Sequence, residues 1–230
     1  MLTIDVISIF PELVTQYAQA GLLGKAQKRK LLRVLAHNPR DAATDRHRTV
    51  DARPYGGGAG MVLQALPILK TAGGLLGKKS PGRSRKIVVL SAKGALFTQR
   101  TAMRWAKDLR HLVLITGRYE GIDERVKRVL GAQEFSVGSY VLSDGDVAAM
   151  VVISAIARLL PGVIKWESLE EESHWNLLKR KEESLGRGVE YPHYTRPESF
   201  MFRGKRYRVP KVLLSGDHKK IASWRASHTT

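Results

Sequence analysis

The chain has 230 residues, 43% of them hydrophobic, which is enough for one to two domains with a buried core. Its 39 Lys and Arg against 21 Asp and Glu give a net charge of +18, which exceeds what solubility needs and predicts a polyanionic partner. Nucleic acid is favoured over membrane, because we find no apolar run of about 18 residues, no amphipathic basic anchor and no signal peptide. The absence of cysteine excludes disulfides and thiolate chemistry and indicates a cytoplasmic protein.

The first elements alternate between strand and helix. Residues 3–10 are rich in β-branched side chains and predict a strand, and Pro11 is suited to open a helix over 11–30 that ends in basic residues. A second strand is expected over 31–38. From 39 to 61 the apolar periodicity disappears, and a loop of that length is usually functional or disordered.

The centre of the chain carries the clearest pattern. A helix over 62–72 is followed by a flexible basic connector, 73–86. The strands expected over 86–91 and 111–116 flank a helix that carries the apolar stripe Ala102, Trp105, Ala106 and Leu109. This β-α-β unit predicts parallel pairing.

The same alternation continues. A helix over roughly 122–130 leads to a strand over 135–143, and a nearly all-apolar helix over 146–160 follows, with Asp144 or Asp146 near its start. This order predicts an α/β fold with an open, mostly parallel sheet covered on both faces.

The composition changes near Gly162, which suggests three regions. Residues 1–163 form the main domain, 164–191 an exposed linker, and 192–230 a small, basic, mainly helical C-terminal domain.

Three predicted strands end in unusual sequences: "LSAKG" (90–94), "ITGRYEG" (115–121) and "SVGSYVLSDGD" (136–146). Ligands in parallel sheets bind beyond the carboxyl ends of strands, and glycine lets backbone approach them closely. Each strand end taken alone favours simple turns, but the three together favour a ligand site. "PYGGGAGM" (54–61) lacks the features of a phosphate loop and is interpreted as a lid or a path for substrate backbone.

A basic segment with one aromatic residue precedes this glycine run. Cations suit phosphates and an aromatic ring suits a stacked base, although a solvated basic loop explains the segment equally well. The candidate RNA-binding residues are Arg46, His47, Arg48, Arg53 and Tyr55. In the tail, basic residues with interleaved aromatics extend the basic surface: Lys205, Arg206, Tyr207, Arg208, Lys211, Lys219, Lys220 and Trp224.

Five motifs now point to a family: "PRDAATDRHRTVDARPYGGGAGM", "GRYEGIDERV", "SVGSYVLSDGD", "PHYTRPE" and "VLLSGDH". In order and spacing they resemble the bacterial tRNA (guanine-N1)-methyltransferases, which modify guanosine 37 beside the anticodon. The resemblance spans almost the whole chain. It implies a knotted (SPOUT-type) methyltransferase fold with a deep trefoil, S-adenosylmethionine as cofactor, tRNA as substrate, and a homodimer whose active site lies at the subunit interface. The apolar faces of helix 147–160 are consistent with that dimer, and a role for Mg²⁺ is left open.

The resemblance also assigns site residues. Glu120 would accept hydrogen bonds from the cofactor or from the target guanine, while His193 and Arg196 of "PHYTRPE" would join the RNA-binding set. The cofactor-binding set is Leu90, Ser91, Gly117, Tyr119, Glu120, Gly121, Ser136, Val137, Gly138, Tyr140, Val141, Leu142 and Gly145.

Methylation of guanine N1 requires removal of its proton by a base and a cation near O6. Arg158 occupies the family's arginine position, and an interface salt bridge is its alternative role. The family's catalytic Asp has no direct counterpart here, so Glu172 (followed by Ser173 and His174) is the preferred base, and Glu183, closer in spacing to "PHYTRPE", is its rival.

The chain departs from the family in other ways that keep alternatives open. Asp144 stands where Gly is common and adds a negative charge beside the cofactor, and Ala148 stands where Pro is usual. If both glutamates belong to a solvated helix face, the protein is a non-catalytic RNA-binding protein on the same scaffold. A methyltransferase for another RNA is the third possibility.

Overall fold

A computed structural model describes residues 1–77, 84–165 and 191–228. The chain divides into two compact units, Met1–Ile164 and Lys165–Thr230. Both candidate bases, Glu172 and Glu183, lie outside the described residues, as does most of the predicted linker. Within the described ranges, no helix is long and apolar enough to cross a membrane.

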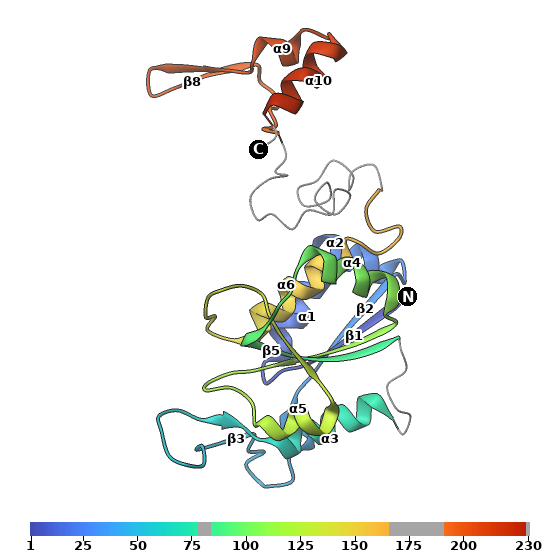
Figure 1. The fold of residues 1–230 in the computed structure, drawn as a ribbon, viewed down its shortest axis with the longest axis vertical. Helices are drawn as coiled ribbons and strands as arrows, with labels where there is room; N and C mark the ends of the chain where they lie inside the picture. The colour runs from blue at the N-terminus through green and yellow to red at the C-terminus, as the bar shows by residue number, and fades with distance from the viewer. Residues whose placement is uncertain (78–83, 166–190, 229–230) are drawn as a thin grey trace. The chain divides into compact units, whose positions relative to one another are not determined.

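The first unit is built on a five-stranded sheet with the order β2-β1-β6-β5-β7 (Figure 1). Every neighbouring pair in this sheet is parallel, which confirms the predicted α/β class. β5 and β6 pair directly and are joined through α4 (Gln99–Asp108), as the predicted β-α-β unit requires. The strands are β1 (Leu2–Ile7), β2 (Leu32–His37), β5 (Arg85–Leu96), β6 (His111–Thr116) and β7 (Gln133–Ser136).

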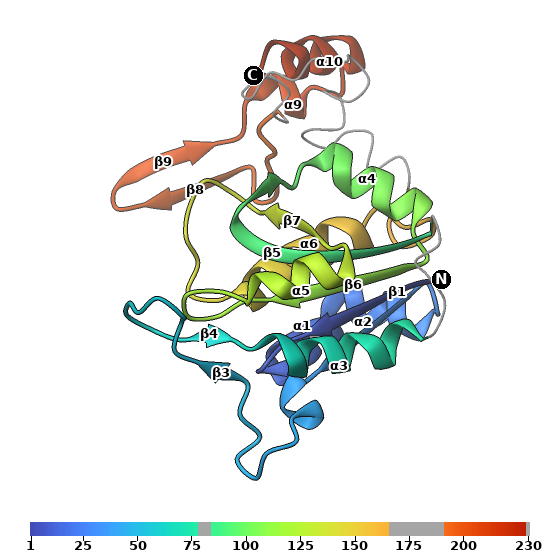
Figure 2. The same ribbon diagram turned by 60° about the horizontal axis from the view of Figure 1, so that its bottom comes forward.

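Helices cover both faces of the sheet, as Figures 1 and 2 show. On one face α1 (Pro11–Gln19), α2 (Gly21–Lys28), α4 and α6 (Gly145–Ala157) enclose a core that includes the fully buried Trp105. On the other face α3 (Ala65–Leu76) and α5 (Glu124–Leu130) enclose a second core. The predicted two-sided cover is therefore confirmed.

Several boundaries differ from the sequence-based expectation. The helix expected over 11–30 is two helices, because Ala20 is extended and Gly21 has a φ of +52°. The strand expected over 135–143 ends at Ser136, where the Ser136 hydroxyl donates to the Gly138 carbonyl at 2.8 Å and the chain turns. The long loop contains a 3₁₀ turn, η1 (Pro39–Ala42), and a small antiparallel pair, β3 (Asp51–Ala52) and β4 (Val62–Leu63).

The second unit contains a β-hairpin that the sequence analysis did not predict. Strands β8 (Ser199–Phe202) and β9 (Lys205–Arg208) are antiparallel and meet at Arg203-Gly204, both with positive φ. Two helices follow, α9 (Lys211–Leu214) and α10 (His218–Ser227). Two consecutive residues with positive φ are typical of a tight hairpin turn. The two helices are consistent with the expected mainly helical tail, to which the structure adds this hairpin.

A buried carboxylate links three adjacent strands of the sheet, β2, β1 and β6. Asp5 on β1 is 4% exposed and contacts Nε2 of His37 on β2 at 2.7 Å and Nε2 of His111 on β6 at 2.6 Å. Because β1 lies between β2 and β6, both contacts reinforce the main-chain ladders. Both imidazoles are partly exposed, whereas only 6% of the Asp5 side chain is exposed.

We expect Asp5→Ala to lower the free energy of unfolding by roughly 2–3 kcal/mol, because both histidines lose a buried acceptor. The measurement is urea denaturation, in which the midpoint should fall with an unchanged slope. Asp5→Asn keeps one acceptor oxygen and should lose less. An Asp5→Ala protein as stable as wild type would show that the cluster does not stabilise the sheet.

Candidate ligand pocket and RNA-facing residues

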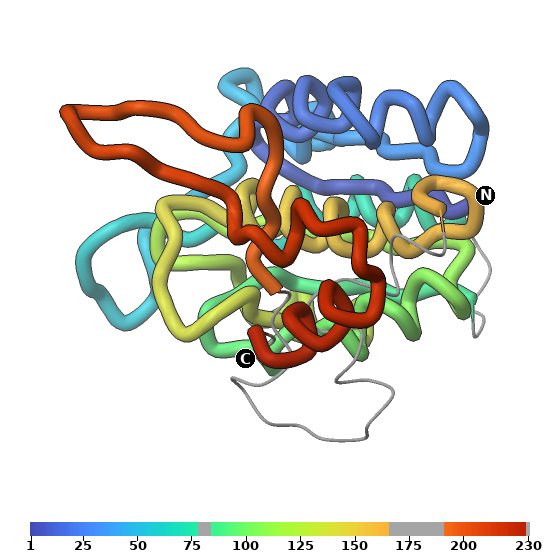
Figure 3. Tube along the Cα trace, turned by 90° about the horizontal axis from the view of Figure 1, so that it is seen from above, coloured from blue at the N-terminus to red at the C-terminus, as the bar shows by residue number. Residues whose placement is uncertain are grey.

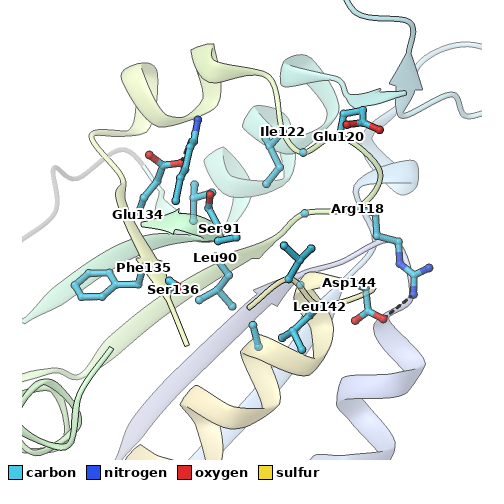
Figure 4. Close-up of a pocket in the computed structure, with 18 of the residues that line it drawn as sticks. Leu90, Ser91, Arg118, Glu120, Ile122, Glu134, Phe135, Ser136, Leu142 and Asp144 are labelled. Atoms are coloured by element: carbon cyan, nitrogen blue, oxygen red, sulfur yellow. Dashed lines mark ion pairs between the residues drawn. The ribbon is translucent and has the colours of Figure 1, made fainter. Parts of the chain in front are cut away.

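A pocket of about 380 Å³ lies beyond the carboxyl ends of β6 and β7 and beside the middle of β5, where the pairing of β5 with β7 shifts register between Leu90 and Ala95 (Figure 4). Its walls come from three segments that are distant in sequence, within 89–93, 117–127 and 134–148. The volume is within the usual range for small-ligand pockets, and the position is where parallel sheets bind ligands. The three strand ends singled out in the sequence thus meet at one site.

Glycine permits the close contact between two of these segments. The Gly145 amide, at the start of α6, donates to the Gly117 carbonyl, just after β6, at 2.8 Å. A Cβ on Gly145 would lie 2.7 Å from the Gly117 nitrogen and 3.0 Å from the Thr116 Cα. Both contacts are with backbone that cannot move aside easily, so a larger residue would separate the segments.

All of the predicted cofactor residues except Gly138 line this pocket. Gly138 sits beneath the Tyr140 ring, where a Cβ would lie 2.2 Å from a ring carbon. Its missing side chain therefore lets Tyr140 fold back, and the Tyr140 hydroxyl donates to the Val137 carbonyl at 3.2 Å.

The glycine-rich run ends along the rim of the pocket. The Glu120 amide donates to the Met61 carbonyl at 3.0 Å, and the Leu63 amide donates to the Gly121 carbonyl at 3.0 Å. The Glu120 side chain lies against Gly60. Gly56, Gly57, Gly58 and Gly60 all have positive φ, a backbone conformation that side chains disfavour.

Arg118 is held at the rim by a ring and two carboxylates. Its guanidinium lies 4.2 Å from the Phe10 ring centroid, and Nη2 is 3.4 Å from Asp144 Oδ2 (Figure 4). Asp144 also caps α6 by accepting from the Asp146 and Val147 amides. Asp146 is fully buried, and its Oδ2, which has no hydrogen-bond partner, lies 3.8 Å from Arg118 Nε. The family departure at Asp144 thus places a carboxylate that orients Arg118.

The pocket lining is acidic although the whole chain is strongly basic. Three lining residues are cationic (Lys93, Arg118, Lys127) and five are anionic (Glu120, Asp123, Glu124, Glu134, Asp144), which gives 3 − 5 = −2 against +18 for the chain. Such a lining favours a ligand that carries positive charge.

Four of these charges form a network that the sequence analysis missed. Lys127 pairs with Glu124 and, at 2.8 Å, with Glu134, and Lys93 lies 3.7 Å from Glu134. The hydrogen bond from Lys127 lowers the pKa of Glu124, and the same bond raises the pKa of Lys127. Only the Glu124–Lys127 spacing on one helix turn was visible in the sequence.

The predicted RNA-binding residues of the long loop lie outside the pocket lining. Arg46, His47, Arg48 and Arg53 are exposed, and Tyr55 is 100% exposed. The loop is shaped by Asp45, which accepts from the Thr49 hydroxyl at 2.7 Å, and this bond lowers the pKa of Asp45. In the second unit, His193 and Arg196 are also exposed.

Arg158 does not line the pocket. It follows α6, whose first residue, Gly145, lies in the pocket wall, and a helix of that length is roughly 20 Å long. Arg158 lies instead beside a second hollow, formed with Tyr17, Leu22 and Ser154. Arg158 and the pocket wall at Gly145 are therefore at opposite ends of α6.

We expect Gly145→Ala to weaken ligand binding in the pocket at least about ten-fold, since the added methyl group separates the segments that form it. The measurement is calorimetric titration with S-adenosylmethionine. Gly73→Ala is the control, because Gly73 is exposed on α3 with open space around its Cα. Equal affinity of Gly145→Ala and wild type would show that the close approach does not shape the pocket.

The described residues contain no group of three or more His, Asp or Glu side chains that could hold a metal ion.

Fold and pocket together define an α/β protein with a pocket of ligand size at the carboxyl edge of a parallel sheet. The particular family follows from comparison: the model of the tRNA (Guanine-1)-methyltransferase TrmD family matches residues 2–230. The chain belongs to that family.

Curated proteins with a related sequence match nearly the whole length of this chain. A tRNA (guanine-N(1)-)-methyltransferase of Thermomicrobium roseum is 48% identical over 96% of this chain and 76% of its own length. Proteins of the same name from Chloroflexus aggregans and Pseudomonas putida F1 are 45% and 42% identical, each over 97% of this chain and over 81% and 83% of their own lengths.

Proposed function

We propose that this protein transfers a methyl group from S-adenosylmethionine to N1 of guanosine 37 in tRNA. The observation that carries the proposal is the pocket, in which the three strand ends of the family motifs converge around the Gly145–Gly117 contact. Family membership supports the reaction. The strongly basic chain suits a tRNA substrate, and a cytoplasmic location follows from that substrate.

The residues of the pocket fit the proposed cofactor. Glycines at 117, 121 and 145 keep this part of the pocket wall free of side chains, so a nucleoside can approach the backbone closely, and Leu90 and Leu142 offer apolar contacts. The net charge of −2 in the lining favours a cationic ligand. When bound, S-adenosylmethionine supplies an activated methyl group on a positively charged sulfur.

The protein must then make guanine N1 nucleophilic. A carboxylate, Glu172 or Glu183, removes the N1 proton, and Arg158 stabilises the negative charge that develops toward O6. Glu120, at the exposed rim, accepts hydrogen bonds from the guanine edge or the cofactor. The target base is flipped out of the anticodon loop to reach the pocket.

The proposal includes a homodimer. An apolar stripe on α6, Val147 and Val151, is partly exposed and continues to Ser154 and Arg158 at helical spacing. Tyr17 on α1 and Leu22 on α2, both partly exposed, border the same hollow as Arg158. In a two-fold dimer with antiparallel α6 helices, the end of one α6 approaches the start of the other. Arg158 of one subunit then acts at the pocket of its partner.

A deep trefoil knot is also part of this proposal. The chain between β7 and α6 returns to the end of β6, where Gly145 contacts Gly117, and β5 shifts register against β7 between Leu90 and Ala95. A trefoil path, a rare exception to the rule against threaded loops, would require these segments to lie this close to each other.

The exposed basic loop would place Arg46, Arg48 and Arg53 on tRNA phosphates, with His47 beside them, and would stack Tyr55 on a base. His193 and Arg196 in the second unit would add contacts.

The direct test is methyl transfer to an unmodified tRNA transcript that contains G36 and G37, followed by mapping of the methylated atom. We expect N1-methylguanosine at position 37 and no product from a transcript with adenosine at that position. Tight binding without methyl transfer, with and without Mg²⁺, would favour the non-catalytic RNA-binding protein. Methylation at another position or of another RNA would overturn the proposed target.

A further inference from the structure

The amino end of α6 lies in the wall of the pocket, and the amino end of a helix attracts anions. Its free amides and the helix dipole together favour a bound phosphate. Gly145, the first residue of α6, and Asp144 before it both line the pocket. Figure 3 shows the chain after β7 as a wide yellow loop that leads into α6. A ligand that fills the pocket therefore meets this helix end.

The protein itself occupies the amides at the start of α6. Oδ1 of Asp144 accepts from the Asp146 amide at 2.9 Å and from the Val147 amide at 3.1 Å. The Gly145 amide donates to the Gly117 carbonyl. The donors that would bind a phosphate are thus already paired with acceptors of the chain.

Arg118, the cation in the wall beside this helix end, is also claimed by the chain. Its Nη2 lies 3.4 Å from Asp144 Oδ2, and its Nε lies 3.8 Å from Asp146 Oδ2 (Figure 4). Asp146 is fully buried, and that oxygen has no hydrogen-bond partner. Two carboxylates therefore face one guanidinium, and the surplus negative charge repels a ligand phosphate.

The other two cations of the lining, Lys93 and Lys127, are paired with glutamates. Lys127 contacts Glu124 and Glu134, and Lys93 lies 3.8 Å from Glu124 and 3.7 Å from Glu134. Each of the three cations in the lining thus has a carboxylate partner. A phosphate would have to displace one of these carboxylates to gain a cation.

We propose that Asp144 makes the pocket select against phosphorylated nucleosides. Its carboxylate takes the place of a phosphate at the start of α6 and holds Arg118 at the same time. An adenosine 5′-phosphate is therefore repelled, whereas an adenosine that carries a positively charged sulfur is accepted. The choice of adenosine as the nucleoside rests on the proposed function.

The test compares adenosine, adenosine 5′-monophosphate and S-adenosylmethionine by calorimetric titration of the full-length protein. We expect the monophosphate to bind wild type at least about ten-fold more weakly than adenosine. In Asp144→Asn the amide oxygen still caps α6, but the charge that pairs with Arg118 is gone, so this difference should shrink by about three- to ten-fold. Asp144→Ser, which also keeps a capping oxygen without the charge, should behave in the same way.

Asp123→Asn is the matched control. Asp123 also lines the pocket, caps α5 by accepting from the Arg125 amide at 2.9 Å and pairs with the Arg125 side chain. This variant removes the same charge from the lining but leaves the start of α6 and Arg118 unchanged. Its ratio of monophosphate to adenosine affinity should stay near that of wild type.

Every result supports or overturns the proposal. Loss of selectivity confined to the Asp144 variants supports it, even in a protein that transfers no methyl group. Equal loss in Asp123→Asn would assign the selectivity to the total charge of the lining and overturn the role of Asp144, as would an unchanged ratio in the Asp144 variants. Monophosphate and adenosine binding equally well to wild type would overturn the selectivity itself. A wild-type protein that binds none of the three ligands would overturn this inference together with the proposed cofactor.

Discussion

Arg158→Gln is expected to slow methyl transfer by about 10²- to 10³-fold, the usual loss when one group that stabilises a developing oxyanion is removed. Affinity for S-adenosylmethionine should stay at the wild-type level, because Arg158 is absent from the pocket lining. The expected signature is a fall in kcat with little change in cofactor binding, measured by single-turnover kinetics and calorimetry. Arg158→Lys keeps the charge but loses the planar fork, so only partial activity should return.

Subunit mixing decides whether Arg158 acts within its own subunit or across the interface. The experiment mixes two variants. Gly145→Ala damages the pocket but keeps Arg158, whereas Arg158→Gln keeps the pocket but lacks the arginine. Each hybrid dimer would contain one intact composite site if Arg158 acts on the partner, so random mixing should restore about a quarter of wild-type activity. Mixed samples as inactive as the separate variants would contradict the composite site. Wild-type activity of Arg158→Gln would leave Arg158 with a salt-bridge role.

The main strands and helices could be predicted because buried positions carry a simple local pattern of apolar residues. The strand expected at 111–116 has the observed bounds, since it is a continuous apolar and β-branched run buried on both faces. Its neighbour in the predicted β-α-β unit pairs with it in parallel. Glycines at 117 and 145 were expected to let backbone approach a ligand, and that stays a prediction; the hydrogen bond between these two residues was not predicted.

What sequence reasoning missed depends on contacts between distant residues. The strand expected to reach 143 stops at Ser136, because the following apolar residues, including Val137 and Leu142, line the pocket instead of continuing β7. The pocket lining is acidic because Glu124 and Glu134 combine with charged residues from other segments. No pattern of neighbouring residues in the sequence predicts the net charge of such a set. Arg158 was assigned as a catalytic cation by the family motif alone, and its distance from the pocket along α6 could not be read from that motif.

Replacement of the general base should have the largest effect of all. We expect Glu172→Gln to slow methyl transfer by about 10²- to 10⁴-fold, because the amide cannot accept the N1 proton, while tRNA and cofactor affinities stay near wild type. Glu183→Gln should keep most activity if Glu172 is the base. The measurement is single-turnover methyl transfer at saturating tRNA and cofactor, at neutral pH, where an ordinary glutamate with a pKa of about 4.3 is ionised.

The reverse pattern, with loss confined to Glu183→Gln, would assign the base to Glu183, whose spacing to "PHYTRPE" is closer to that of the family's aspartate. The aspartate replacement of whichever residue is essential provides the control, since it restores a carboxylate one methylene shorter and should recover part of the rate. A rate that falls as the pH drops toward the ordinary glutamate pKa would follow from loss of the ionised base. Full activity in both Gln variants would remove the two glutamates from the mechanism, because neither could then be the group that takes the N1 proton.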